Sequence, residues 1–279
     1  VVGTDKNHQL FTNGETIEVA TNHWQINYPE YFNASSIFFH LMEKDARPQV
    51  NFDFNSISGN QIPVTIYTEL SIEMFKNETV RVLRELEQDY GPWPHPQLII
   101  YGAGSGGMEH AGATRTSFRA LGHELTHSYF ARGVMPARGN SGWIDEAIAS
   151  WRDSGYQQRT RGSLQFSRMA GHSIYQRTTD TDAYSKGARL MGYFDYRFQE
   201  QGGMKSFLKT FFEKYKYQLI LTSTLQDELE ASFNFDLEEI FNPYVYGKHY
   251  YNTPISLNTS SVENPYHPTL SYKELESLL

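Results

Sequence analysis

The sequence contains no cysteine among its 279 residues. This absence excludes disulfide bonds, zinc sites built from thiolates, iron–sulfur clusters and cysteine nucleophiles. If the chain holds a metal or a nucleophile, then histidine, carboxylate, serine or water must supply the reacting groups. The compartment stays unknown, because a reducing cytoplasm and a disulfide-poor cell envelope or secreted setting all permit a chain without cysteine.

Long apolar runs and an excess of basic residues are also missing. No window approaches the roughly 18 consecutive apolar residues of a membrane-spanning helix, and no basic stretch followed by an apolar run opens the chain. We expect no membrane span, with any targeting segment removed or outside this sequence. Lys and Arg number 24 against 32 Asp and Glu, a formal net charge of −8, so a nucleic-acid partner is not expected. Aromatic residues make up 15% of the chain, enough for a firm core.

The hydrophobic pattern changes along the chain from alternation to helical spacing. Alternation predicts short strands at 16–20, 23–27, 37–41, 50–54, 64–67 and 98–101. Spacings of three and four predict a helix from residue 71 to the Gly91-Pro92 pair, then helices at about 117–132, 145–160, 184–200, 204–216, 224–232 and 236–241. Thr224 and Asp236 are predicted to cap the last two.

Strands first and helices second are typical of the α+β class. We predict a strand-rich lobe over residues 1–116, which contains one helix, and a helical lobe over 117–250. Residues 251–279 are predicted to form a connector and a short terminal helix.

The strongest chemical signal is His123-Glu124-Leu125-Thr126-His127. Residues four apart on a helix lie one turn above each other, so both imidazoles project from the same face and can reach one metal ion. Zinc binds neutral imidazole and accepts mixed nitrogen and oxygen ligands. Glu124 lies beside the pair, where its carboxylate can contact a water molecule at the metal rather than the metal itself.

A third metal ligand is predicted at Glu146, separated from His127 by residues 128–145. Its neighbours in Trp143–Ala149 are mostly apolar, so its carboxylate should be partly buried and should need a cation. Two histidines, one glutamate and an open fourth position are typical of a catalytic zinc site with one Zn²⁺ per chain.

The segment Gly106-Gly107-Met108-Glu109-His110 precedes this helix. Two glycines after a strand let another backbone approach closely, as a peptide along a sheet edge would require. Glu109 supplies a negative charge that can pair with a substrate ammonium. The glycines at 102, 104 and 107 also match a dinucleotide-binding pattern, but no helix of apolar periodicity follows directly, so we do not assign that function.

Together these motifs resemble the zinc aminopeptidases of the aminopeptidase N family. That resemblance calls for a tyrosine in a Tyr-x-Lys-Gly segment, and Tyr184-Ser185-Lys186-Gly187 supplies one. His110 stands where that family usually has Asn, and the segments 109–114 and 132–139 are closer to the related glycyl aminopeptidase family. The eighteen-residue spacing fits aminopeptidase N better, so both families stay open. The resemblance covers about residues 24–250.

The resemblance implies a thermolysin-like, two-lobed catalytic domain that hydrolyses peptides with one zinc ion. In it, His123, His127 and Glu146 would hold the metal, and Glu124 would act as the general base. Tyr184 would donate a hydrogen bond to the scissile carbonyl oxygen. The substrate's amino end would bind at Glu109, with Gly106, Gly107 and His110 beside it.

Two other functions remain open at this stage. A catalytically silent relative would use the cleft to bind protein, although all of the expected site residues are present. An endopeptidase would cleave peptides whose amino end is blocked. The related families also carry an N-terminal β-domain for which little room exists before residue 24, so the chain is expected to be an excised catalytic domain or to have a more open site. The preferred terminal residue and the oligomeric state stay undetermined.

Overall fold

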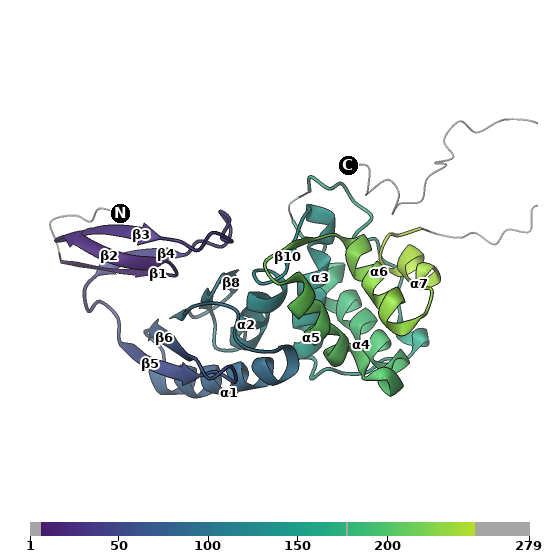
Figure 1. The fold of residues 1–279 in the computed structure, drawn as a ribbon, viewed down its shortest axis with the longest axis horizontal. Helices are drawn as coiled ribbons and strands as arrows, with labels where there is room; N and C mark the ends of the chain where they lie inside the picture. Colours follow the sequence, from purple (N-terminus) through teal and green to yellow (C-terminus); the bar gives the residue numbers. More distant parts are fainter. Residues whose placement is uncertain (1–6, 177, 249–279) are drawn as a thin grey trace, which may run out of the picture.

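The computed structural model describes residues 7–176 and 178–248 (Figure 1). Strands dominate its first part: β1 (His8–Thr12), β2 (Glu15–Ala20), β3 (His23–Asn27), β4 (Phe39–Glu43), β5 (Gln49–Asn55), β6 (Gln61–Thr68), β7 (Leu98–Gly102), β8 (Gly107–His110) and β9 (Ala113–Thr116). Only one helix, α1 (Ile72–Tyr90), interrupts these described strands.

Helices dominate the later part of the chain. They are α2 (Leu121–Phe130), α3 (Trp143–Asp153), α4 (Ala188–Arg197), α5 (Gly203–Tyr215), α6 (Thr222–Phe233) and α7 (Glu238–Tyr244). A π-helical turn, Ala183–Gly187, precedes α4, and the two-residue strands β10 (Met135–Pro136) and β11 (Leu219–Ile220) pair in parallel. The fold is therefore of the mixed helix-and-strand class that the sequence predicts.

Five strands form the central sheet in the order β5-β6-β7-β9-β8. The inner strands β6, β7 and β9 run parallel, whereas β5 and β8 pair antiparallel with their neighbours at the two edges. Because β8 is an edge strand, one side of its backbone faces away from the sheet. Two further antiparallel pairs, β1 with β4 and β2 with β3, lie beside the sheet (Figure 1).

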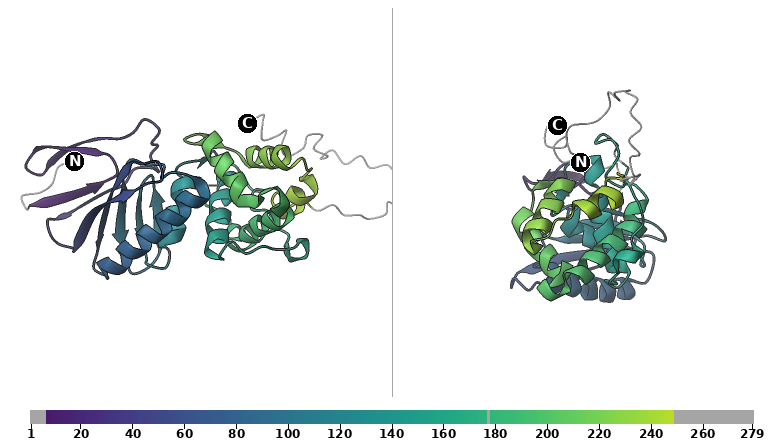
Figure 2. Two further views of the ribbon diagram at one scale, coloured as in Figure 1. Left: turned by 60° about the horizontal axis from the view of Figure 1, so that its bottom comes forward. Right: turned by 90° about the vertical axis from the view of Figure 1, so that its right-hand side faces the viewer.

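The two faces of the sheet belong to two different cores. Ile66 and Ile100 join a large cluster of buried residues that continues through α1 and the C-terminal helices. Tyr67 and Ile99, their neighbours in sequence, point to the other face and join Phe11 and other residues in a smaller cluster beneath β1 and β4. This alternation follows from the two-residue period of a strand. The left view of Figure 2 shows α1 lying along one face of the central sheet, the face that packs into the large cluster.

The boundaries of several elements differ from the predicted ones. The helix predicted at 117–132 begins at Leu121, and the helix predicted at 145–160 spans Trp143–Asp153. The second helix ends because Gly155 and Tyr156 both adopt positive φ. Thr224 does not cap its helix, which begins two residues earlier, and its hydroxyl instead accepts a hydrogen bond from the Leu221 amide (3.2 Å).

Five of the described strands were not expected, namely β1, β8, β9, β10 and β11. The last four have only two to four residues each, and β1 takes its partner β4 from a distant part of the chain. Asp236 lies one residue before the N-cap of α7, where it accepts a hydrogen bond from the Glu238 amide (2.8 Å). The connector and helix predicted over 251–279 lie outside the described residues. Among the described residues, none of the helices has both the length and the apolarity to traverse a bilayer.

Candidate metal centre

Helix α2 carries the two histidines of the predicted metal site. His123 and His127 lie one turn apart on the same face, with their ring centroids 4.7 Å apart. The helix is almost wholly buried, and His127 is 2% exposed. A buried helix places its side chains accurately because packing restricts their movement. The predicted helical spacing therefore places both imidazoles side by side.

Helix α3 packs against α2 and places Glu146 between the histidines. Glu146 Oε2 lies 3.1 Å from His123 Nε2 and 3.5 Å from His127 Nε2. One ligand atom from each of the three residues falls within 4.8 Å of the other two. Among the described residues, no other group of three or more histidines and carboxylates meets this criterion.

The electrostatics of this cluster favour a cation at its centre. Burial raises the pKa of Glu146, but hydrogen bonds from His123 and His127 outweigh that effect and hold the pKa well below its usual range. Burial lowers the pKa of His123, yet its bonds to Asp153 and Glu146 raise that pKa to about 10. The carboxylate of Glu146 thus favours a positive charge at this position, which a bound metal ion would supply in place of protons. Two imidazoles and one carboxylate fit the ligand preferences of zinc.

A chain of charged side chains extends from His123 away from the cluster. His123 Nδ1 lies 2.8 Å from Asp153 Oδ2, at the end of α3. The neighbouring Arg152 lies 3.3 Å from Asp153 Oδ1 and contacts Glu85 of α1 through two atoms, each 2.9 Å from a carboxylate oxygen. A Cβ at Gly122 would lie 2.0 Å from the guanidinium of Arg152, so the guanidinium occupies the space left by the missing side chain of this glycine.

Glu124 lies on the same helix, buried against β8. Its Oε2 has no hydrogen-bond partner among the described residues. Burial, partly offset by the charges of His127 and His123, raises the pKa of Glu124 to about 7. A Cβ at Gly107 would lie 1.9 Å from Glu124 Oε1, so the missing side chain at Gly107 makes room for this carboxylate. From the sequence, we predict for Gly107 only that it lets a substrate backbone approach the sheet edge.

Tyr184 lies in the π-helical turn and contacts the cluster at Glu146. Its hydroxyl donates a hydrogen bond to Glu146 Oε1 (2.8 Å), and its ring lies parallel to that of His123 with centroids 6.3 Å apart. Burial and this hydrogen bond raise the pKa of Tyr184 above its ordinary value, so the hydroxyl keeps its proton at neutral pH. Gly187 lets the turn pack on α3, because a Cβ there would lie 2.7 Å from that of Ala147.

The remaining predicted residues lie along the edge strand. Glu109 on β8 lines a cavity of about 650 Å³ together with Asp145, the neighbour of Glu146. Gly106 precedes the strand with a positive φ of 70°, which glycine adopts without strain. His110 is half-buried and packs against the ring of Phe38, with ring centroids 5.3 Å apart. Burial and the charge of Arg132 lower its pKa.

Four site residues were not predicted from the sequence: Glu85, Arg132, Arg152 and Asp153. Asp153 follows Glu146 by seven residues, two helical turns, and this spacing could have indicated that both carboxylates share a face of α3. Nothing in the sequence pattern places Arg132 beside Glu109 or Glu85 beside Arg152. These contacts join separate elements.

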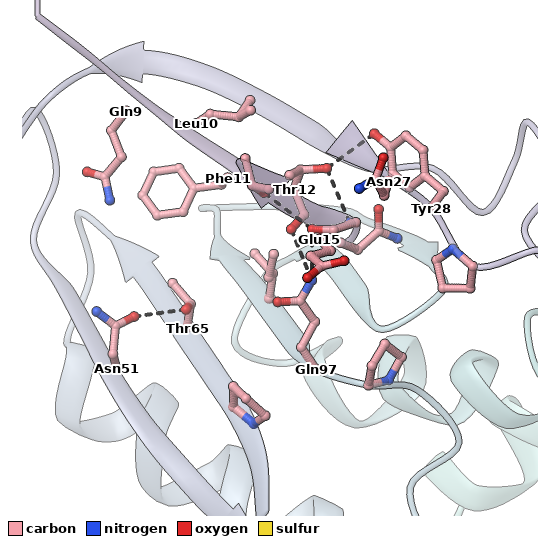
Figure 3. A pocket seen from close by; sticks show the side chains of 17 residues that line it. Gln9, Leu10, Phe11, Thr12, Glu15, Asn27, Tyr28, Asn51, Thr65 and Gln97 are labelled. Carbon is pink, nitrogen blue, oxygen red and sulfur yellow. Dashed lines mark hydrogen bonds between the residues drawn. The ribbon is translucent and has the colours of Figure 1, made fainter. Parts of the chain in front are cut away.

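A second cavity, of about 780 Å³, lies between β1 and the central sheet and does not touch the metal cluster (Figure 3). Its lining includes Thr12, whose hydroxyl lies 3.2 Å from that of Tyr28, and Thr65, which donates a hydrogen bond to Asn51. Among the described residues that line it, Glu15 is the only carboxylate, and none is a histidine. This lining therefore offers no set of three metal ligands like that of the metal cluster.

The fold is shared with solved zinc peptidases. Aminopeptidase A of Legionella pneumophila, in complex with aspartic acid, aligns with a TM-score of 0.60 at 14% identity, covering 85% of this chain and 33% of that one. A mutant M1 zinc metallopeptidase of Deinococcus radiodurans, bound to a Tyr-Ser-Ala substrate, aligns with a TM-score of 0.63 at 15% identity, covering 88% and 62%. Yeast LTA4 hydrolase in complex with bestatin aligns with a TM-score of 0.61 at 15% identity, and the alignment covers 87% of this chain and 45% of the hydrolase.

At these identities the likeness shows a common fold, and this chain spans less than two thirds of the length of each of these proteins. No protein-family model matches the sequence, and a search of curated proteins finds no match.

Proposed function

We propose that this chain is a zinc-dependent metallopeptidase that removes residues from the amino end of peptides. The observation that carries the proposal is the convergence of His123, His127 and Glu146, with Glu124 and Tyr184 beside them. The fold shared with zinc peptidases supports it. In this proposal residues 1–116 and 117–250 are the two lobes of a thermolysin-like catalytic domain, and the metal centre lies at the start of the second.

The cluster of His123, His127 and Glu146 would hold the zinc ion. Its donor set of two imidazoles and one carboxylate leaves room for a water molecule and a substrate. When bound, zinc supplies a Lewis acid that polarises a carbonyl and lowers the pKa of a coordinated water to about 7. The chain's own residues then have to move protons and orient the peptide.

Glu124 would move the proton. Its carboxylate is buried beside the cluster, and one oxygen lacks a partner among the described residues, so this oxygen can accept a proton from a water molecule and return it. It takes a proton from the attacking water while the water oxygen bonds to the scissile carbonyl carbon. The same proton then passes to the leaving nitrogen as the C–N bond breaks, so the net change is addition of one water molecule.

Tyr184 would stabilise the negative charge that develops on the carbonyl oxygen. Its protonated hydroxyl belongs to a side chain that is 43% exposed and borders the cluster, so it can turn from Glu146 toward a substrate. Loss of one such donor typically raises the barrier by about 2.7–4 kcal/mol.

Glu109 would receive the ammonium group of the substrate. It lies on β8, whose outer edge can pair with an extended peptide, with Gly106, Gly107 and His110 around it. An anchor for the amino end at this place fixes which peptide bond reaches Glu124.

The proposal is tested by hydrolysis of short peptides with free and acetylated amino ends, by the zinc-loaded chain and after treatment with a chelator. We expect cleavage that chelation abolishes and zinc restores. Glu124→Gln should lower kcat by at least about a thousandfold while zinc stoichiometry stays at one, because the variant loses the proton acceptor and keeps the ligands.

Glu73→Gln, on the exposed side of α1, is the matched control and should keep full activity. A chain that binds zinc but cleaves no peptide would identify a silent binding module, and a chain that binds no zinc would overturn the proposal.

A further inference from the structure

Arg132 forms an ion pair with Glu109 at the predicted substrate anchor. It lies just after the end of α2, and its Nη2 donates to Glu109 Oε1 (2.8 Å) and to the Glu109 carbonyl (3.3 Å). Its Nη1 donates to Ser35 Oγ (2.6 Å). The two charged side chains are only 13% and 21% exposed. The guanidinium is therefore held by three hydrogen bonds, one of them to the Glu109 carboxylate, and is largely shielded from water.

The pair lies where a peptide at the metal centre would extend. Both residues line the cavity of about 650 Å³ that also contains Asp145, the residue before Glu146. On the other side, Gly107, two residues before Glu109 on β8, lies directly against the carboxylate of Glu124. A substrate between Glu124 and this cavity would meet both members of the ion pair.

The lining of this cavity is not predominantly acidic. Its two carboxylates, Glu109 and Asp145, are accompanied by two guanidinium groups, Arg132 and Arg138, and Arg132 pairs directly with Glu109. An unpaired, poorly solvated carboxylate would bind an ammonium group strongly and reject a neutral amide. Beside Arg132, the same ammonium is attracted by Glu109 and repelled by the guanidinium, so most of that selectivity disappears.

We propose that Arg132 is a specificity-determining residue that neutralises Glu109, so that the cavity admits peptides with an uncharged amide at this position. The preference for a free amino end in the proposed function would then be weak, and the site would also cleave N-acylated peptides and internal peptide bonds. This inference rests on the proposed peptidase function and concerns the breadth of its substrates.

The test compares kcat/KM for matched peptides with a free and an acetylated amino end, using the full chain loaded with zinc. We expect the free-to-acetylated ratio to be below about ten for the natural sequence, and Arg132→Gln to raise it roughly tenfold by exposing the charge of Glu109. Arg132→Lys keeps the positive charge and should leave the ratio near its original value. The double variant E109Q/R132Q removes both charges, so its free-to-acetylated ratio should lie near that of the natural sequence.

Arg115→Gln is the matched control, because Arg115 lies on the neighbouring strand β9 and contacts only the Ser105 carbonyl among the hydrogen bonds described. It should leave the ratio unchanged within twofold. Thermal unfolding verifies that each variant folds, and the ratio of the natural sequence tests the proposal even if Arg132→Gln does not fold.

A natural ratio above about ten, or a ratio that does not rise in Arg132→Gln, would overturn the inference. Binding of the same two peptides to Glu124→Gln, measured by calorimetry, gives the selectivity without turnover. It therefore separates a wrong assignment of Arg132 from a failure of the peptidase proposal.

Discussion

Asp153 fixes how His123 faces the metal position. Its Oδ2 lies 2.8 Å from His123 Nδ1, which leaves Nε2 directed at Glu146. Partners of this kind hold the imidazole in one tautomer and typically change metal affinity by about 10–100-fold when lost. We expect Asp153→Asn to weaken zinc binding by that factor, measured by competition with a chromophoric chelator. Unchanged affinity would show that Asp153 has no role in positioning.

Arg152 acts one step further from the metal, and its effect should be smaller. It contacts both Asp153 and Glu85, so Arg152→Gln should weaken zinc binding less than Asp153→Asn does. Arg81 offers a matched control because it contacts the same Glu85 (3.0 Å) from the exposed face of α1. If Arg81→Gln weakens zinc binding as much as Arg152→Gln does, the contacts from Arg152 through Asp153 to His123 do not determine zinc affinity.

At the level of single residues, the sequence predicts the candidate metal ligands better than the residues that contact the site from other elements. His123, His127 and Glu146 are recognisable because helical spacing within one element, and the chemistry of a buried carboxylate, are local properties. Arg132 and Glu85 take their meaning from partners 23 and 67 residues away. No local pattern encodes contacts of that range.

Among the elements, the π-helical turn carries the most specific prediction. Gly187 at its end lies so close to α3 that a Cβ would be 2.7 Å from that of Ala147. Gly187→Ala should push the turn away and destabilise the chain by about 1–3 kcal/mol, as overpacking does. Because Tyr184 sits on this turn, kcat should fall while zinc affinity changes little, and both can be measured on the same preparation.

Gly162→Ala is the control for that substitution, because a Cβ at Gly162 would meet nothing within 4 Å and the φ of this glycine is not in the left-handed region. It should leave the free energy of unfolding unchanged within about 0.5 kcal/mol. Equal destabilisation by both substitutions would contradict the packing argument for Gly187.

The elements themselves were predictable where their periodicity was long. Helix α1 has polar and apolar faces over 19 residues, and its predicted end at Gly91 is observed. Strands β8 and β9 have four residues each and became strands only through pairing with each other and with β7. The placement of β8 at the sheet edge, beside α2, brings Glu109 near the candidate metal centre.

At the scale of the whole molecule, a bound metal should stabilise the fold. The three ligands come from α2 and α3, so a zinc ion would connect two helices of the large core. A ligand at a hundred times its Kd stabilises the folded state by about 2.7 kcal/mol. We expect zinc to raise the Tm of the chelator-treated chain by several degrees, measured by calorimetry.

Glu146→Gln should remove most of this stabilisation, since it deletes the ligand that bridges both histidines. An equal rise in Tm for this variant and for the natural sequence would place the zinc elsewhere on the chain.

The sequence by itself determined the mixed class of the fold. It also singled out the candidate metal ligands, the candidate proton-transfer residue and the tyrosine, because each lies in a short motif whose chemistry is local. Only the tertiary structure decided the environment of these groups: the glycine that admits Glu124, the Asp153–Arg152–Glu85 contacts behind His123, and the guanidinium on Glu109. The reason is physical, since burial, charge pairing and close approach depend on which elements pack together, and packing joins residues that are far apart in the chain.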